Sequence, residues 1–430
     1  MTKFFLKDIE KMIRRVRIIL VIIVGFISLI GLQSCNDEPT VMGSTLLYDT
    51  VAIYPISTQT HPLISSLDSR RIDFNIRDRG VFHVGIFKDV KAFSILQFFE
   101  VIRNTDTLDY LRNYNASQIL SCKLKIPLDK YVLGDTNSIS FKIYNVTKDW
   151  PSDSIKQDYD QALGYLDMSK IIGEFTGKDS SGFISIDINK ELIIEWFNIW
   201  YDNKVLKDLT KITWGLALVP NNSVEAIRSF IGYVNTSSNY PYLEVIYNDS
   251  LGIRDTLTIR EETDKSFYSV APNNPNELVV QGGVSTRGII RFDITQIPYR
   301  SAIHEAQLEL TINKDKSFSG NYGLDTILLW EQPRDTSKYY YDALDVAKDR
   351  ILQYDYGKKI EDKYYFYYIA PALELINRNK GLGEIAIRNS STQDEKRELD
   401  RLVFYGLDAP DSTKRPVLKI IYSKRPEFKR

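Results

Sequence analysis

Apolar and polar residues alternate along many short segments of this chain, a pattern typical of strands with one buried face. In 118–128, for example, the alternation would place Leu120, Cys122, Leu124 and Ile126 on the same face. Asp, Asn, Gly or Ser residues, which favour turns, follow many of these segments. The pattern therefore predicts a protein that is built mainly from short strands.

The same eight-residue ending occurs twice, as YPYLEVIY at 240–247 and as RPVLKIIY at 415–422. The segments before each ending also follow in a matching order: 94–101, 118–128, 138–150, 182–203 and 212–220, then 286–295, 301–312, 325–332, 363–379, 383–389 and 400–406. In each series one segment, 182–203 or 363–379, begins as a strand and continues with helical spacing. We interpret the chain as two copies of one plan.

This order predicts an all-β fold of two tandem antiparallel β-sandwiches, each with a short helix. We expect the first sandwich in 51–250 and the second in 251–430. The polar stretch 248–267 should join the copies, with pairing as a hairpin left open. Residues 38–91 should supply the opening strands of the first copy.

The N-terminus has the features of a leader that is removed. A basic region precedes the apolar run Ile18–Gly31, which is short for a membrane-spanning helix, and LQSC follows at 32–35. These residues resemble the lipobox of bacterial lipoproteins, which implies a signal peptide at 1–34, a lipid on Cys35 and a lipidated tether at 35–50. A signal anchor with an incidental cysteine is the alternative.

The charge and the cysteine content narrow the class of protein further. The formal net charge is −1, and removal of the basic leader makes the rest more acidic, which argues against a nucleic-acid partner. Cys122 is the only cysteine besides Cys35, so no disulfide is expected within a lipidated chain, and the alternating pattern predicts that it is buried and inert.

Motifs for catalysis or cofactor binding are missing from the sequence. The chain has three histidines, His61, His83 and His304, and none has metal-ligand spacing to another. No nucleophile elbow, phosphate-binding loop or dinucleotide fingerprint occurs. Residues 313–321 alternate oxygen side chains but lack the glycine and the closing acid of a calcium loop. We expect no enzyme activity, no metal and no cofactor.

Aromatic residues make up 12% of the chain, and they are the one feature that could mark a ligand surface. Trp150, Trp196 and Trp214 fall at core positions. Tyr339, Tyr340 and Tyr341 are adjacent, so in a strand at least one would face solvent, and Trp330 ends a nearby strand. We predict that these three tyrosines and Trp330 bind glycan; an aromatic flank on a helix is the alternative interpretation of the tyrosines.

The second copy is similar to the DNRLRE family of extracellular β-sandwich domains. The resemblance rests on RGIIRFDIT at 287–295, on Ala306–Leu310 and on Arg415–Tyr422, whereas in the first copy Tyr240 replaces the arginine. It implies jelly-roll-like modules that are related to carbohydrate-binding modules.

Together these patterns predict a non-catalytic, lipid-anchored envelope protein that binds glycan or mediates adhesion. The acidic Asn36–Glu38 resembles the surface-export signal of Bacteroidota lipoproteins, so we expect it in the outer membrane and at the cell surface, with the periplasmic face left open. A structural lipoprotein that docks onto another envelope protein is the alternative function.

Overall fold

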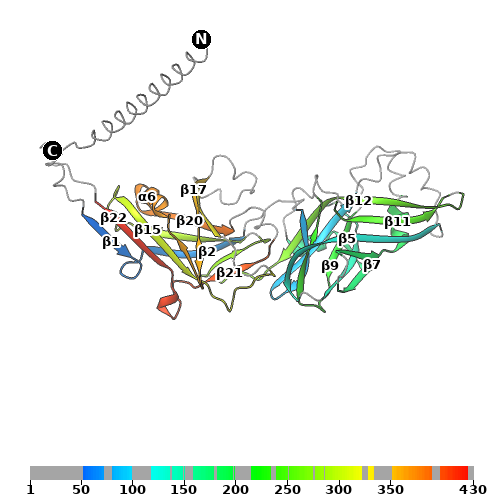
Figure 1. The fold of residues 1–430 in the computed structure, drawn as a ribbon, viewed down its shortest axis with the longest axis horizontal. Helices are drawn as coiled ribbons and strands as arrows, with labels where there is room; N and C mark the ends of the chain where they lie inside the picture. The colour runs from blue at the N-terminus through cyan, green and yellow to red at the C-terminus, as the bar shows by residue number, and fades with distance from the viewer. Residues whose placement is uncertain are drawn as a thin grey trace, which may run out of the picture. The chain divides into compact units, whose positions relative to one another are not determined.

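The computed structural model describes residues 52–424, except for 72–79, 99–117, 136–137, 149, 151–157, 179–181, 197, 199–214, 234–238, 250, 275–276, 285, 322–327, 334–350 and 390–397. Ile53–Arg430 form one compact unit, separate from Met1–Ala52. Strands dominate it and pair antiparallel (Figure 1), which confirms the predicted all-β sandwich fold. In the described part of the chain, no helix is both long enough and apolar enough to span a membrane.

In the described residues of the first half, ten strands are joined into one hydrogen-bonded array. One layer contains β8 (Phe183–Asp187), β5 (Ile119–Gly134), β11 (Tyr242–Asn248) and the first part of β12 (Arg254–Ser269). The other contains β10 (Ala226–Ile231), β3 (Val81–Phe87), β4 (Val90–Phe98), β9 (Gly215–Pro220), β6 (Ile139–Val146) and β7 (Leu166–Gly177). The long strands β5 and β12 contribute to both layers because each pairs with different neighbours along its two parts.

The second half consists of two separate sheets. The five-stranded sheet has the order β1 (Ile53–Ser57), β22 (Val417–Ser423), β15 (Ala302–Thr311), β19 (Lys363–Phe366) and β18 (Lys358–Ile360). The seven-stranded sheet has β17 (Ile351–Tyr356), β16 (Leu328–Pro333), β20 (Leu382–Asn389), β14 (Thr286–Asp293), β13 (Leu278–Gln281) and β21 (Arg401–Phe404), with β2 (Ile64–Arg71) paired to β14.

Two short helices lie where the sequence predicts them, one in each half. Residues 190–196 are helical in the first half, after β8. In the second half α6 (Ala370–Arg378) follows β19 and has a proline in its first turn, where the missing N–H leaves no bond unmade. The first half also contains α4 (Tyr159–Leu163), and the 3-10 helix η5 (Ser412–Lys414) precedes β22.

The two halves share one strand order. β11 lies between β12 and β5, just as β22 lies between β1 and β15. β4 pairs with β9 and β12, just as β14 pairs with β20 and β2. The two parts of β12 therefore occupy in the first half the positions that β1 and β2 occupy in the second.

This pairing differs from the ranges expected for the two sandwiches. The first described strands, β1 and β2, complete the second half, whereas β12, which follows residue 250, completes the first. In Figure 1 the blue strand β1 lies beside the red strand β22. The sequence leaves open whether 248–267 pairs as a hairpin; in the structure β12 turns back onto β11, and the hairpin pairs 242–248 with 254–260 within the first half. Alternation shows which face of a strand is buried but not which of two similar sheets the strand joins. The pattern therefore could not show that β1 and β2 belong to the second half and β12 to the first.

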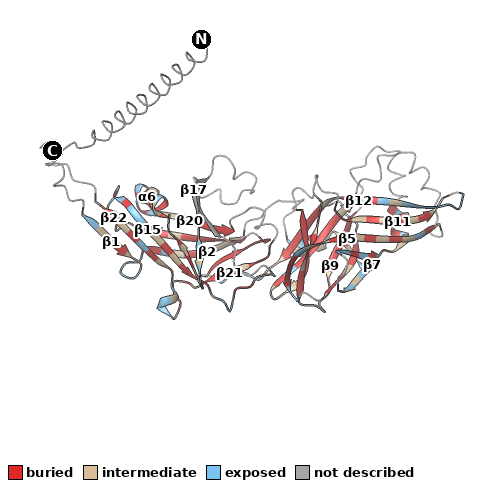
Figure 2. Cartoon of the chain, viewed as in Figure 1, coloured by how far each residue is buried: buried red, intermediate tan, exposed pale blue. Residues whose placement is uncertain are grey.

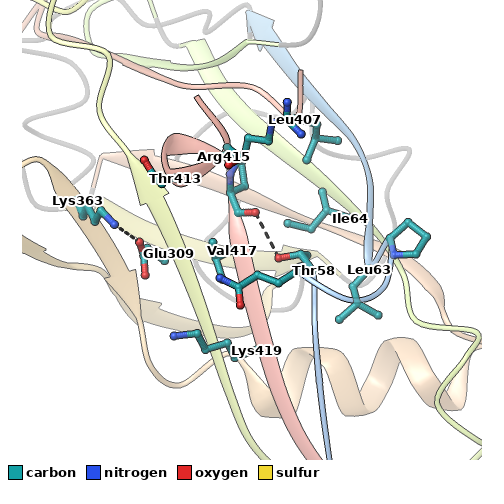
Figure 3. A pocket seen from close by; sticks show the side chains of 14 residues that line it. Thr58, Leu63, Ile64, Glu309, Lys363, Leu407, Thr413, Arg415, Val417 and Lys419 are labelled. Atoms are coloured by element: carbon teal, nitrogen blue, oxygen red, sulfur yellow. Dashed lines mark hydrogen bonds and ion pairs between the residues drawn. The ribbon is translucent and has the colours of Figure 1, made fainter. Parts of the chain in front are cut away.

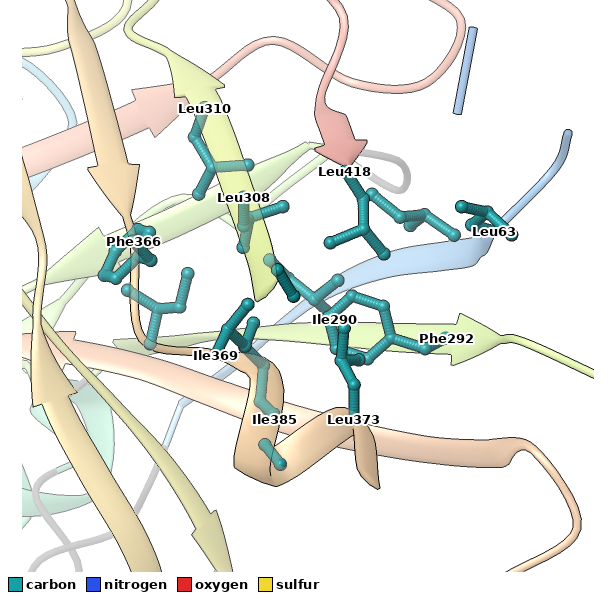
Figure 4. Close-up of a cluster of buried hydrophobic side chains, with 14 of the residues drawn as sticks. Leu63, Ile290, Phe292, Leu308, Leu310, Phe366, Ile369, Leu373, Ile385 and Leu418 are labelled. Atoms are coloured by element: carbon teal, nitrogen blue, oxygen red, sulfur yellow. The ribbon is translucent and has the colours of Figure 1, made fainter. Parts of the chain in front are cut away.

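Each half has its own core, formed by the alternate inward residues of its strands (Figure 2). Figure 4 shows the core of the second half, where Leu308, Ile290, Leu373 and Leu418 point toward one another from strands of both sheets and from α6. Leu63 of the β1–β2 segment belongs to the same cluster and is fully buried. The segment that contains β1 and β2 is therefore part of the core of the second half.

The halves are linked by a smaller cluster of buried side chains. Tyr131 and Tyr268 of the first half pack there with Phe318 and Leu399 of the second. The Tyr131 hydroxyl donates to Asp400 Oδ1 at 2.8 Å and accepts from Leu399 N at 2.9 Å. Burial, followed by the nearby Asp400 charge, raises the pKa of Tyr131 well above its ordinary value.

Candidate functional site

A polar pocket of about 690 Å³ opens on the second half, beside the five-stranded sheet (Figure 3). Its walls come from the corner between β1 and β2, from the segment that leads into β22, and from β15 and β19. The lining residues are Thr58, Gln59, Pro62, Leu63 and Ile64, then Leu407, Ser412, Thr413, Arg415, Pro416, Val417 and Lys419, and finally Glu309 and Lys363. Segments from both ends of the described chain therefore meet here.

The corner between β1 and β2 is fixed by Thr58. Its backbone N–H donates to Leu418 O at 2.9 Å, and its hydroxyl accepts from Leu418 N at 3.0 Å. The hydroxyl also donates to Pro416 O at 3.4 Å. Because Pro416 has no N–H, β22 can begin here without an unpaired donor at that residue, while the threonine hydroxyl satisfies Leu418 N and Pro416 O.

The segment before β22 is held by its own side chains. Asp411 accepts from the backbone N–H and the hydroxyl of Thr413 at 3.0 and 2.6 Å, and the hydroxyl bond is the main cause that lowers the pKa of Asp411. Arg415 Nε donates to Ala409 O at 2.7 Å. This bond orients the guanidinium group while leaving its two terminal nitrogens available.

The charged side chains of the pocket lie on the outer face of the sheet. Leu308, Leu418 and Ile420 point into the core, so Glu309 and Lys419, which alternate with them, point outward. Lys363 forms an ion pair with Glu309, and this hydrogen bond raises the pKa of Lys363. No carboxylate among the described residues forms an ion pair with Lys419 or Arg415.

Two tyrosines extend this face beyond the pocket. Tyr365 lies directly opposite Glu309 in the β15–β19 pair, so their side chains share one face. Its ring stacks on Tyr367 with a centroid separation of 5.9 Å and an interplanar angle of 13°. Tyr367 is exposed. The pocket therefore borders a pair of parallel aromatic rings, a surface on which the apolar face of a sugar can pack.

The corresponding face of the first half carries different chemistry. By the repeated ending, Tyr240 stands where the second half has Arg415, and Glu244 stands where it has Lys419. The charges there are paired: Lys123 with Asp187 at 3.4 Å, and Lys125 with Glu244 at 3.8 Å. Tyr240 contacts the Arg260 guanidinium, which lies 5.5 Å from its ring centroid.

The predicted site residues lie almost entirely outside the described residues. Tyr339, Tyr340, Tyr341 and Cys35 belong to ranges that the structure does not describe. Trp330 lies on β16, where its backbone pairs with Asp355 and Ile387. The glycan-binding assignment of the tyrosines and Trp330 therefore stays a prediction.

Other predictions can be compared with the structure. Trp150 and Trp196 are buried, as expected of core residues. Cys122 is buried too, and desolvation raises the pKa of its thiol to about 12, which makes it unreactive at neutral pH. Leu120, expected on the same face as Cys122, is instead exposed, because the β5–β11 register shifts beside it.

The described residues contain no group of three or more His, Cys, Asp or Glu side chains that could hold a metal ion. His304 lies on β15, and its Nε2 is 2.8 Å from Ser423 Oγ, which is a structural contact. Sequence reasoning missed the pocket because its residues have no common motif. The bonds between Thr58 and the start of β22 join positions that are 358 and 360 residues apart.

Comparisons with known proteins give no relative from which a role can be transferred. No family model matches the chain, and no curated protein matches it. A solved structure of the Macrobrachium rosenbergii nodavirus aligns over 87% of this chain and 90% of its own, with 9% identity. The TM-score of that alignment is 0.14, so no argument rests on it.

Proposed function

We propose that this chain is a lipid-anchored protein of the cell envelope that binds a polysaccharide in the pocket of its second half. The observation that carries this proposal is the pocket beside the Tyr365–Tyr367 stack, with hydrogen-bonding and charged side chains along its walls. Sugar sites combine polar groups that fix orientation with apolar rings that cover a sugar face.

The anchor is proposed from the sequence of the first 35 residues. A basic region, a short apolar run and LQSC occur in order, and an acyl chain on Cys35 would hold the protein at a membrane. Metabolic labelling with an alkyne fatty acid is expected to modify the wild-type chain and not the Cys35→Ser variant. Equal labelling of both proteins would exclude this anchor.

The sugar-binding proposal is tested with a polysaccharide array probed with the full chain in detergent. We expect saturable binding to at least one polysaccharide, and weaker binding by a Tyr365→Ala/Tyr367→Ala variant. Tyr299→Ala, which removes an exposed tyrosine elsewhere in the second half, serves as the control. Failure of the full chain to bind any polysaccharide, with recovery of an envelope protein in a crosslinking experiment, would favour the docking function instead.

A further inference from the structure

The charge balance of the pocket is the starting point. Three cationic side chains line it, Lys363, Arg415 and Lys419, against one carboxylate, Glu309. Lys363 already neutralises Glu309 through their ion pair. The pocket therefore has two positive charges with no anionic partner among the described residues.

Arg415 is held in a geometry that suits an anion. Its Nε is engaged by Ala409 O, so the plane of the guanidinium group is set by the protein. The structure gives the two terminal nitrogens no partner within the described ranges, and Arg415 lies one residue before the rigid Pro416. A planar group with two free donor nitrogens can bind two oxygens of a carboxylate or of a sulfate at once.

Lys419 adds a second positive charge from the middle of β22. Its cross-strand neighbours are Gln307 on β15 and Ser57 on β1, both uncharged. A carboxylate partner across the strand stabilises an ammonium group in a sheet, as Glu244 does for Lys125 in the first half. Lys419 faces the pocket without such a partner among the described residues.

The first half supplies an internal comparison. Tyr240 and Glu244 replace the two cations at the equivalent positions, and the neighbouring lysines are both paired. The two uncompensated cations are thus specific to the half that carries the pocket. A feature required only to stabilise the shared strand order would be expected in both halves.

We propose that Arg415 and Lys419 bind acidic groups along a polysaccharide, either uronate carboxylates or sulfate esters. This inference rests on the proposed function and narrows it to anionic polysaccharides. Glu309, held by Lys363, is then placed to accept a hydrogen bond from a sugar hydroxyl. Tyr365, opposite Glu309, lies on the same face to contact the sugar ring.

The test is affinity electrophoresis of the full chain in detergent, with gels that contain polygalacturonate, dextran sulfate or neutral dextran. We expect retardation by one of the acidic polymers, and a dissociation constant at least about tenfold higher for Arg415→Ala/Lys419→Ala, because two charge-assisted contacts are lost. Which acidic polymer retards the chain distinguishes carboxylate from sulfate.

The matched control is Lys123→Ala/Lys125→Ala, which removes two positive charges from the equivalent face of the first half. Binding that this control retains, and that the pocket variant loses, would support the inference. Equal loss in both variants would show unspecific attraction to charge and would overturn it. Retardation by neutral dextran that neither variant changes would also overturn it while leaving sugar binding intact. No retardation by any polymer would contradict both proposals.

Discussion

The two halves of this chain have the same strand order, but two of the strand positions are filled by different parts of the sequence in each half. In the first half β12 continues directly from β11 and runs through both layers as one strand of 16 residues. In the second half the same two positions are filled by β1 and β2, which come from the other end of the chain and are separated by a corner. The strand order is retained, but the connectivity is not.

This difference explains where the pocket lies. The corner Thr58–Leu63 supplies four of the lining residues, and Ile64, the first residue of β2, supplies a fifth. This corner exists because β1 and β2 are separate strands. In the first half the corresponding position is inside β12, where a register shift between Glu261 and Thr263 is the only interruption. A continuous strand leaves no corner to form a wall. The separation of β1 and β2 thus gives the second half a corner that the continuous strand β12 does not form.

The largest effect is expected from deletion of Ile53–Arg71. This removes β1 and β2 and uncovers core residues of the second half, including Leu63 and Leu67, so the second half should lose more than about 5 kcal/mol and unfold. Hydrogen exchange should then show unprotected amides in β14 and β22, while β11 and β5 stay protected. Deletion of Met1–Ala52, a separate unit, is the control and should leave all four strands protected. Loss of protection in β11 first would contradict the assignment of β1 and β2 to the second half.

A smaller and more local effect is expected from Leu67→Ala in β2. Leu67 is buried opposite Ile290, and its truncation should lower the free energy of unfolding by about 2–5 kcal/mol. The matched change is Ile259→Ala in β12, which is buried in the first core. Urea denaturation combined with hydrogen exchange should show each variant weakening a different half. If both variants weakened the same half, the assignment of β2 to the second half and of β12 to the first would be wrong.

The coupling between the halves is tested by Tyr131→Phe. The change removes a donor to Asp400 and an acceptor for Leu399 N inside a buried cluster, so a loss of about 1–3 kcal/mol is expected. Urea unfolding followed by tryptophan fluorescence should separate into two transitions in the variant if this contact joins the halves. Ser138→Ala, an exposed hydroxyl change in the first half, should not alter the curve.

The raised pKa of Tyr131 also gives a pH dependence. Its neutral form is favoured in the folded protein, so above the ordinary tyrosine pKa, about 10, the unfolded chain releases a proton that the folded chain keeps. The free energy of unfolding should therefore fall as the pH rises above about 10, by up to about 1.4 kcal/mol per pH unit for this one group. The slope should be smaller in Tyr131→Phe. An identical slope in both proteins would assign the dependence to other tyrosines, such as Tyr159, whose pKa burial raises to about 12.

The smallest effect is expected for the paired charges of the first half. Glu244→Gln removes the partner of Lys125, and both side chains are partly exposed, so the change should be within about 1 kcal/mol. The loss should also shrink at high salt, which screens the pair. A thermal unfolding series at two salt concentrations measures it. A large effect that salt does not alter would mean that Glu244 has a packing role.

Much of the architecture followed from the sequence, because alternation and repeated endings report directly on which side chains face a core. The strands around Leu124, Phe292 and Leu308 and the helix after β19 were predicted at their observed places. Residues 261–265 belong to a stretch that the sequence predicts as a polar connection, but Glu261, Asp264 and Lys265 are buried in the structure. Asp264 accepts a hydrogen bond from Tyr233 N at 2.9 Å. A polar residue can be buried once it has partners, and partners from distant strands leave no local signal.

The pocket could not be predicted for the same reason. Arg415 was visible in the repeated ending, and so was its replacement by Tyr240, but nothing near it in sequence places Thr58 or Lys363 beside it. A site of this kind depends on which strands become neighbours. Strand pairing is determined by contacts over the whole sheet and not by the residues near the site.

The position of β1 also determines the route by which mechanical force would pass through the protein. If Cys35 anchors the chain, a pull between the membrane and a ligand in the pocket enters at Ile53 and reaches β22 through the five residue pairs of β1. Thr58, which follows that strand, bonds to the backbone of Leu418 in β22 and of Pro416, which lines the pocket. The load would thus be transmitted within the second half alone. The first half, although it comes next in the sequence, would remain free of tension while the ligand is held.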